Sequence, residues 1–169
     1  MPHHRVSRRA ALAAFGGFAA LGLAGCGASR ASTGRFGVQY TDAQWLARLG
    51  AKRYAVLRRQ DTEAPWSSPL EYEHRAGIYV CAGCDLALFS SKTKFESGTG
   101  WPSFYAPLRN AVQTQTDASL GDVRTEVHCR RCGGHLGHLF NDGPPPTGLR
   151  YCMNGLALQF HAGKISART

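Results

Sequence analysis

Four of the six cysteines in this chain fall into two Cys-x-x-Cys pairs, a spacing at which thiolates commonly bind a metal. The pairs are Cys81 with Cys84 and Cys129 with Cys132. Each pair can place two thiolates on one tight turn, and two such turns complete the tetrahedral site that Zn²⁺ takes in structural roles. Residues 85 to 128 separate the pairs, which is longer than the usual zinc-finger gap. The pattern therefore predicts a structural zinc site that braces two parts of a sheet.

Oxidation is the competing fate of these four thiols. If the chain is exported, it meets a disulfide-forming compartment in which the same cysteines can pair. Export in the folded state would let zinc bind in the cytoplasm first, and a bound metal is coupled to the stability of the fold. The paired spacing favours zinc over disulfides.

Cys152 is the cysteine left over when the two pairs and Cys26, in the N-terminal segment, are set aside. Arg150 lies two residues before it and on the same face if the segment is a strand, and a nearby guanidinium favours the thiolate. A buried structural cysteine is an equally good interpretation of this position. His135 and His138 lie three residues apart and offer either proton transfer or further metal ligation. Their spacing alone does not choose between these roles.

The first 25 residues have the pattern of an export signal. Three arginines precede an apolar stretch from Ala10 to Ala24, which is too short to span a bilayer comfortably. The Arg8-Arg9 pair resembles a twin-arginine signal. We therefore expect residues 1–25 to be removed.

The end of this segment, Leu23-Ala24-Gly25-Cys26, resembles a bacterial lipobox. In that interpretation Cys26 becomes the first residue of the mature protein and carries the lipid anchor. Simple cleavage nearby, with Cys26 uninvolved, is the alternative. Residues 26–38 are mostly small or polar, which predicts a flexible tether.

The remainder, residues 39–169, is predicted to be one mainly β domain. Short apolar runs separated by Gly, Pro, Asn and Asp predict strands at 77–80, 86–89, 123–127, 136–140 and, in part, 156–160. Upstream, Thr41 to Gln44 has the spacing of a capping box and predicts a helix that ends at Gly50, with a second short helix over 51–59. Two prolines predict a loop within 61–68.

The composition indicates a globular protein, with 43% hydrophobic and 18% charged residues. The net charge of +9 is compatible with an anionic partner. The body contains no run of Lys and Arg interleaved with aromatic residues. We therefore expect no nucleic-acid partner, and we expect a monomer.

Four runs of sequence, taken in order, resemble B-type methionine sulfoxide reductases. They are KFESGTGWPSF (94–104), RTEV (124–127), GHLGHLFNDGP (134–144) and GLRYCMN (148–154). With both cysteine pairs in register, the resemblance covers about residues 40 to 161. It implies a β-tent-like fold of two antiparallel β-sheets with short N-terminal helices, and zinc at the end away from the active site. The implied reaction is reduction of methionine-R-sulfoxide, preferably within proteins, to methionine.

The resemblance also implies an active site built around Cys152, the nucleophile that becomes a sulfenic acid. The other implied site residues are His135, His138, Asn154, Arg150 and Trp101. The histidines and the asparagine would polarise the sulfoxide oxygen, and the arginine would assist the thiolate. The tryptophan would form an apolar wall for the substrate methyl group.

Two departures from the family pattern matter. Many relatives carry a second, recycling cysteine where this chain has Thr99. Without it we expect the sulfenic acid to be reduced by an external thiol, either a thioredoxin-like protein or another reductant. After the nucleophile the family usually has Ile-Asn-Ser-Ala-Ser, whereas this chain keeps Asn154 within Met-Asn-Gly-Leu-Ala. These neighbours predict a pocket of altered shape.

The sequence thus predicts a repair enzyme for oxidised envelope proteins. It would be lipid-anchored on the periplasmic side of the inner membrane or in the cell envelope, with a soluble periplasmic protein as the alternative. Two other classes of function are open. One is a zinc-ribbon binding module in which Cys152 is inert. The other is a dithiol redox protein that uses its Cys-x-x-Cys pairs.

Overall fold

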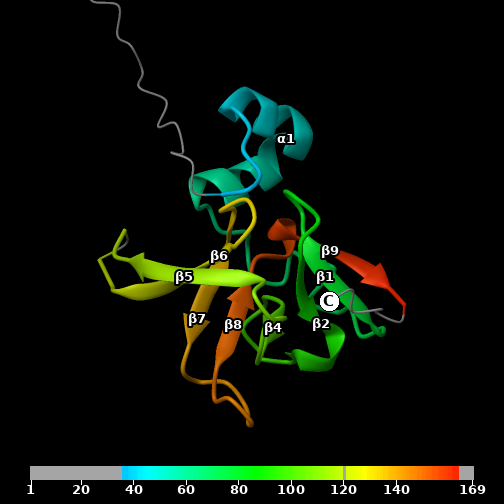
Figure 1. Cartoon of the computed structure of the whole chain (residues 1–169). Helices are drawn as coiled ribbons and strands as arrows, with labels where there is room; N and C mark the ends of the chain where they lie inside the picture. Colours follow the sequence, from blue (N-terminus) through cyan, green and yellow to red (C-terminus); the bar gives the residue numbers. More distant parts are fainter. Residues whose placement is uncertain (1–35, 120, 164–169) are drawn as a thin grey trace, which may run out of the picture.

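Two antiparallel β-sheets make up most of the computed structural model, which describes residues 36–119 and 121–163 (Figure 1). The strand order is β2-β1-β9 in the smaller sheet and β3-β4-β8-β7-β6-β5 in the larger. The predicted mainly β fold of two antiparallel sheets is confirmed. The expected export signal, the tether up to residue 35 and Cys26 lie outside the described residues.

The smaller sheet consists of β1 (Gly77–Cys81), β2 (Ala87–Ser90) and β9 (Leu158–Ala162). The larger sheet consists of β3 (Lys94–Phe95), β4 (Ser103–Phe104), β5 (Val112–Asp117), β6 (Arg124–Cys129), β7 (His135–Phe140) and β8 (Arg150–Met153). Two short 3-10 helices, η1 (Ser91–Thr93) and η2 (Gly155–Ala157), precede β3 and β9. Four predicted strands are confirmed, and the fifth is half correct because η2 occupies its first residues.

A single helical element, α1 (Asp42–Arg59), lies across one end of the sheets (Figure 1). Thr41 and Gln44 form the predicted capping box, in which each side chain accepts a hydrogen bond from the other residue's backbone N–H. Gly50 has φ 70° and ψ 166°, so it interrupts the helix and leaves two short halves, as the sequence predicts. Among the described residues, no helix has the length and apolar character needed to cross a membrane.

Aromatic side chains join the two sheets. The ring of Phe89 on β2 stacks on that of Phe104 on β4 with centroids 4.4 Å apart, and Tyr79 on β1 meets Phe104 edge-on at 4.9 Å. All three side chains are fully buried. Because β4 pairs directly with β8, this packing fixes the small sheet against the strands that carry the candidate site.

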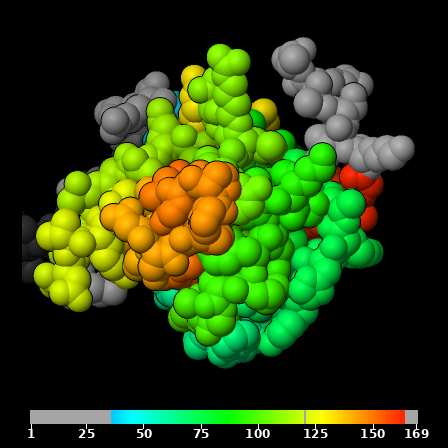
Figure 2. Space-filling view, turned by 90° about the horizontal axis from the view of Figure 1, so that it is seen from below, coloured from blue at the N-terminus to red at the C-terminus, as the bar shows by residue number. Residues whose placement is uncertain are grey.

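The connection between β7 and β8 folds back beside β4. Thr147 Oγ1 donates to the carbonyl oxygen of Tyr105 at 2.7 Å, immediately after β4. Figure 2 shows this connection, in orange, lying against green segments of the chain. The connection helps to seat β8 between β4 and β7, so residues of β8 have neighbours on both sides.

Candidate functional site

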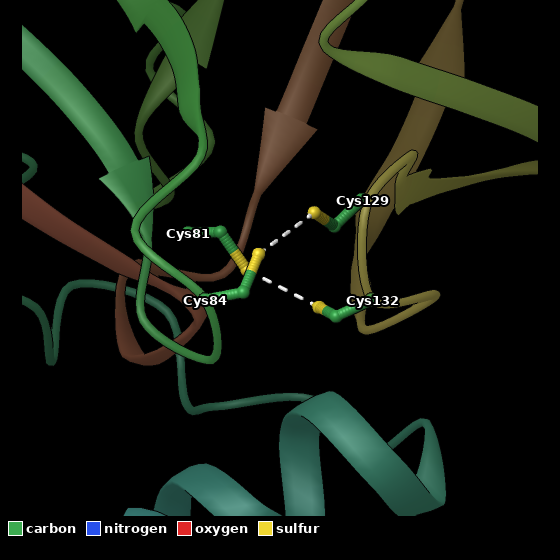
Figure 3. A group of neighbouring side chains, drawn as sticks. All are labelled: Cys81, Cys84, Cys129 and Cys132. Atoms are coloured by element: carbon green, nitrogen blue, oxygen red, sulfur yellow. Dashed lines mark hydrogen bonds between the residues drawn. The ribbon is translucent and has the colours of Figure 1, made fainter. Parts of the chain in front are cut away.

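The four paired cysteines gather into one cluster. Cys81 and Cys129 end strands β1 and β6, while Cys84 and Cys132 lie in the turns that follow (Figure 3). All four sulfur atoms lie within 4.8 Å of one another. The cluster confirms that the two pairs meet. It corrects one detail of the prediction, because β1 and β6 belong to different sheets and the brace therefore joins two sheets.

The two turns have matching backbone geometry. In each, the residue four positions after the first cysteine adopts a left-handed conformation: Asp85 has φ 57° and Gly133 has φ 67°. The same residue donates its N–H to the carbonyl oxygen of that first cysteine at 2.8 Å in both turns. This fold of the backbone turns both thiols of a pair toward the opposite pair.

The sulfur spacing fits a tetrahedral metal site better than a disulfide. Cys81 and Cys132 sulfurs are 3.7 Å apart, and those of Cys84 and Cys129 are 3.5 Å apart. Thiolates bound at roughly 2.3 Å to one tetrahedral ion lie about 3.8 Å from one another, whereas a disulfide bond is about 2.05 Å long. The donor set is therefore that of a structural metal site.

This metal site is remote from Cys152. Glu126 pairs with His138, His138 pairs with Cys152, and Cys129 lies three residues further along β6. Strand spacing and rise per residue then separate Cys129 from Cys152 by about 14 Å. A metal held by the four thiolates acts on the fold and not on chemistry at Cys152.

Cys152 lies on β8 between two strands, with Ser103 of β4 opposite it on one side and His138 of β7 on the other. Gly137 allows this close approach, since a Cβ there would overlap the carbonyl oxygen of Cys152. Thr99 Oγ1 lies 3.9 Å from the Cys152 sulfur. The cysteine is thus held in a crowded, mostly polar environment.

A cavity of about 130 Å³ opens beside this thiol. It is lined by Thr62, Trp101, Arg124, Gly137, His138, Phe140, Cys152 and Asn154. Of the predicted site residues, the cysteine, tryptophan, asparagine and one histidine line the cavity directly.

Burial raises the pKa of the Cys152 thiol above its ordinary value of 9.0. The charge of Arg150 acts in the opposite direction but does not prevail. That guanidinium is also bound by Asp142, to which Nε and Nη2 donate at 2.8 and 2.9 Å, and it stacks on the Phe140 ring. The resting cysteine is therefore a thiol, and attack requires a group that accepts its proton.

His138 lies opposite Cys152 on β7 and lines the same cavity, which makes it the candidate for that group. Its Nε2 lies 2.7 Å from Oδ2 of Asp117, at the end of β5. Burial is the main cause that lowers its pKa, while the bond to Asp117 acts against that effect. The ring is thus neutral at rest and able to accept a proton.

His135 lies next to His138, with ring centroids 5.3 Å apart, and is not among the cavity-lining residues. It is engaged through its other nitrogen, because Nδ1 lies 2.6 Å from Oε1 of Glu126. Its buried Nε2 makes no hydrogen bond within the described part of the chain. The predicted role of His135 at the sulfoxide oxygen stays a prediction.

Asn154 and Trp101 are both tied to Glu63. The backbone N–H of Glu63 donates to Oδ1 of Asn154 at 3.0 Å, and its carbonyl oxygen accepts from Nε1 of Trp101 at 3.1 Å. The Glu63 carboxylate accepts from the backbone N–H groups of Gly155 and Leu156 at the start of η2. The side-chain oxygen of Asn154 is thus bound to the backbone of Glu63, and the same residue fixes the position of the Trp101 ring.

Sequence reasoning missed Glu63, Asp117, Arg124 and Glu126. Glu126 and Arg124 fall within the RTEV run, so their strand was predicted although their contacts were not. The other two lie in a segment predicted as a loop and in a strand with no apolar alternation. No local signal marks either one.

Comparisons with known proteins agree on one family. The family model described as the SelR domain matches residues 49–162. The peptide methionine sulfoxide reductase MsrB of Thiobacillus denitrificans is 55% identical over 122 residues, which are 72% of this chain and 92% of that protein. The MsrB of Bradyrhizobium diazoefficiens is 54% identical over 120 residues, covering 70% and 86%. The MsrB of Pseudomonas putida is 52% identical over 124 residues, covering 73% and 93%.

Among solved structures, the Mis18 "Yippee-like" domain shares 18% identity with this chain at a TM-score of 0.44. The likeness covers 54% of this chain and 100% of that one. At this level it adds nothing to the sequence relatives.

The raised thiol pKa predicts how Cys152 reacts with iodoacetamide. In the folded protein the alkylation rate of Cys152 should rise about tenfold per pH unit from pH 7 to pH 9, because only the thiolate reacts. Mass spectrometry of the Cys152 peptide measures the rate. In urea the thiol leaves its buried site, so the same titration should reach its midpoint at lower pH. A rate that is already constant at neutral pH in the folded protein would contradict the raised pKa.

Proposed function

The chain belongs to the MsrB family of peptide methionine sulfoxide reductases, which reduce methionine-R-sulfoxide in proteins, and on that premise we propose that Cys152 is the nucleophile. One observation carries the assignment. Within residues 36–119 and 121–163, Cys152 is the one cysteine outside the four-thiolate cluster, and it lines a cavity beside a neutral histidine.

The reaction moves one oxygen atom and two electrons. The Cys152 sulfur bonds to the sulfoxide sulfur while its proton leaves, and a proton is delivered to the sulfoxide oxygen. The sulfur–sulfur bond and the substrate's sulfur–oxygen bond then break as the oxygen bonds to Cys152, which is oxidised to sulfenic acid while the substrate is reduced to methionine. His138 lies opposite Cys152 on the neighbouring strand and lines the same cavity, so in this proposal it is the acid and base of the exchange.

The remaining site residues act on the substrate or on the thiolate. The Trp101 indole lines the cavity and contacts the S-methyl group, since sulfur and aromatic rings attract each other weakly. Arg150 contributes the positive charge that stabilises the thiolate once it forms. Asn154 and His135 hold the cavity's shape and its polarity, through the bonds to Glu63 and Glu126.

An external thiol regenerates the enzyme in this proposal. The position at which many relatives carry a recycling cysteine is Thr99, whose Oγ1 is 3.9 Å from the Cys152 sulfur and cannot form a disulfide. The other thiols of the described residues lie in the cluster about 14 Å away. A thioredoxin-like protein or a small dithiol would reduce the sulfenic acid directly.

Zinc is the metal we assign to the four-cysteine cluster. Four thiolates in a tetrahedral arrangement suit Zn²⁺, which has no redox chemistry of its own and serves to hold the two turns together. The ligands would be Cys81, Cys84, Cys129 and Cys132.

Residues 1–38 suggest where the enzyme works. The apolar segment and the Leu-Ala-Gly-Cys sequence support export, cleavage before Cys26 and attachment of lipid to that cysteine. The substrates would then be oxidised proteins of the cell envelope. A soluble periplasmic enzyme is the alternative if cleavage occurs without lipid.

Turnover of dabsyl-methionine-R-sulfoxide with dithiothreitol tests the nucleophile. The wild-type protein should reduce the R epimer and not the S epimer, and Cys152→Ser should lose this activity because a hydroxyl is a much weaker nucleophile. Chromatography of the dabsyl products measures both rates. After one turnover without reductant, dimedone should label Cys152 as sulfenic acid.

Retention of turnover by Cys152→Ser would refute the assignment of the nucleophile. A disulfide between Cys152 and any other cysteine after that single turnover would refute external recycling.

Metal analysis tests the cluster. The purified protein should contain one zinc per chain, and Cys84→Ser should lose it. Metal loss should lower Tm by roughly 10 °C, since closing the loop between the two cysteine pairs contributes about 4 kcal/mol. Elemental analysis and thermal unfolding are the measurements. Cys152→Ser is the control and should keep both zinc and Tm. A metal-free protein with unchanged Tm would contradict a structural site.

Labelling with an alkyne-tagged palmitate tests the anchor. In a bacterial host the full chain should be labelled and sediment with membranes, while Cys26→Ala should be unlabelled. Fractionation and in-gel fluorescence give both results. A wild-type chain that is exported but carries no label would support the soluble alternative instead.

A further inference from the structure

Asp117 accepts four hydrogen bonds, two of them from Arg124 and His138, which line the active-site cavity. Its Oδ1 accepts from the backbone N–H of Ser119 at 2.9 Å and from the Ser119 hydroxyl at 2.6 Å. Its Oδ2 lies 2.7 Å from Nη2 of Arg124 and 2.7 Å from Nε2 of His138. The bonds from Ser119, His138 and Arg124 hold the pKa of this carboxyl far below its usual range. Asp117 is therefore a fixed, ionised acceptor.

An ionised carboxylate cannot donate a hydrogen bond. The short contact to His138 therefore requires the proton to be on Nε2 of the imidazole. In a neutral ring the other nitrogen, Nδ1, then carries the lone pair. His138 lines the cavity and lies opposite Cys152 across the strand pair. Nδ1, the ring nitrogen that Asp117 leaves free, is therefore the one that can accept a proton from the thiol.

We propose that Asp117 is a positioning residue that locks His138 in the Nε2–H tautomer, so that Nδ1 can carry a proton from the Cys152 thiol to the sulfoxide oxygen. The inference rests on the proposed role of Cys152. The thiol S–H bond breaks as the sulfur–sulfur bond forms, and Nδ1 receives that proton. Nδ1 then returns it to the sulfoxide oxygen. The sulfur–sulfur bond and the substrate's sulfur–oxygen bond break as the oxygen bonds to Cys152 as sulfenic acid, so no proton is gained or lost overall.

Arg124 completes the arrangement from β6. It shares the same carboxylate oxygen with His138, so it fixes the direction in which Asp117 faces. Its charge also lowers the pKa of His138, against the effect of Asp117. Asp117 thus stabilises the imidazolium formed during the reaction, and Arg124 makes that imidazolium a stronger acid.

The neighbouring His135 provides an internal comparison. Its Nδ1 faces Glu126 at 2.6 Å, so the same reasoning requires a proton on Nδ1 and a lone pair on Nε2. Burial by itself would raise the pKa of Glu126, but hydrogen bonds from His135 and Gln115 lower it. The two adjacent histidines are therefore expected to hold opposite tautomers.

Long-range ¹H–¹⁵N correlation spectra of the full, metal-loaded wild-type chain test the tautomers directly. The expected result is Nε2–H for His138 and Nδ1–H for His135, assigned by single His→Gln variants. An Nδ1–H tautomer at His138 would overturn the proposal. This measurement requires neither turnover nor a stable Asp117 variant.

The variant Asp117→Asn tests the consequence for catalysis. Its amide can present an N–H to His138, which would reverse the tautomer. We expect kcat to fall on the order of 10²-fold while KM changes little, with His138 shifted to Nδ1–H in the same spectra. Asp122→Asn is the control and should have wild-type kcat, because Asp122 is exposed in the connection between β5 and β6.

Two outcomes separate this proposal from the proposed function. A reversed tautomer with unchanged kcat would overturn the role of Asp117 and leave Cys152 as the nucleophile. Retained turnover in Cys152→Ser would refute the proposed function whatever the Asp117 variant does. If Asp117→Asn unfolds, as circular dichroism would show, the wild-type spectra still decide the tautomer.

Discussion

The position of β8 between β4 and β7 is the constraint on which the active site depends. That pairing places Ser103 on one side of Cys152 and His138 on the other, although the three residues are far apart in the sequence. It also demands glycine at position 137, where any side chain would collide with the backbone of β8. The aromatic contacts between the sheets and the β7–β8 connection both serve to keep β8 in this place.

Titratable side chains surround the site in hydrogen-bonded pairs. Asp117, Glu126 and Asp142 each bind a basic side chain, namely His138, His135 and Arg150. A buried cysteine in such surroundings stays protonated at rest, which protects it from indiscriminate oxidation. The same hydrogen-bonded pairs are arranged to support charge separation once a substrate enters, because the dipoles are already in position.

Features carried by local spacing were predictable from the sequence. The cysteine pairs, the capping box at Thr41 and the break at Gly50 each depend on a few adjacent residues, and each is confirmed. Features that depend on distant partners were not. Asp117 lies in β5, whose mostly exposed polar residues give no alternating pattern, and Glu63 meets its partner Asn154 across 91 positions. The joining of two separate sheets by the cysteines was also not predictable, because the pairing of distant strands decides which sheet a strand belongs to.

The separation of the two cysteine pairs along the chain has a topological meaning. A metal held by all four thiolates turns residues 85–128 into a closed ring, and that ring contains Thr99, Trp101, Asp117 and Arg124. By the loop-entropy relation for cross-links, closing 44 residues removes about 4 kcal/mol of freedom from the unfolded chain. With the metal in place, the segment that supplies one side of the active site is thus held as a closed loop, which limits how far it can separate from the strand that carries the nucleophile.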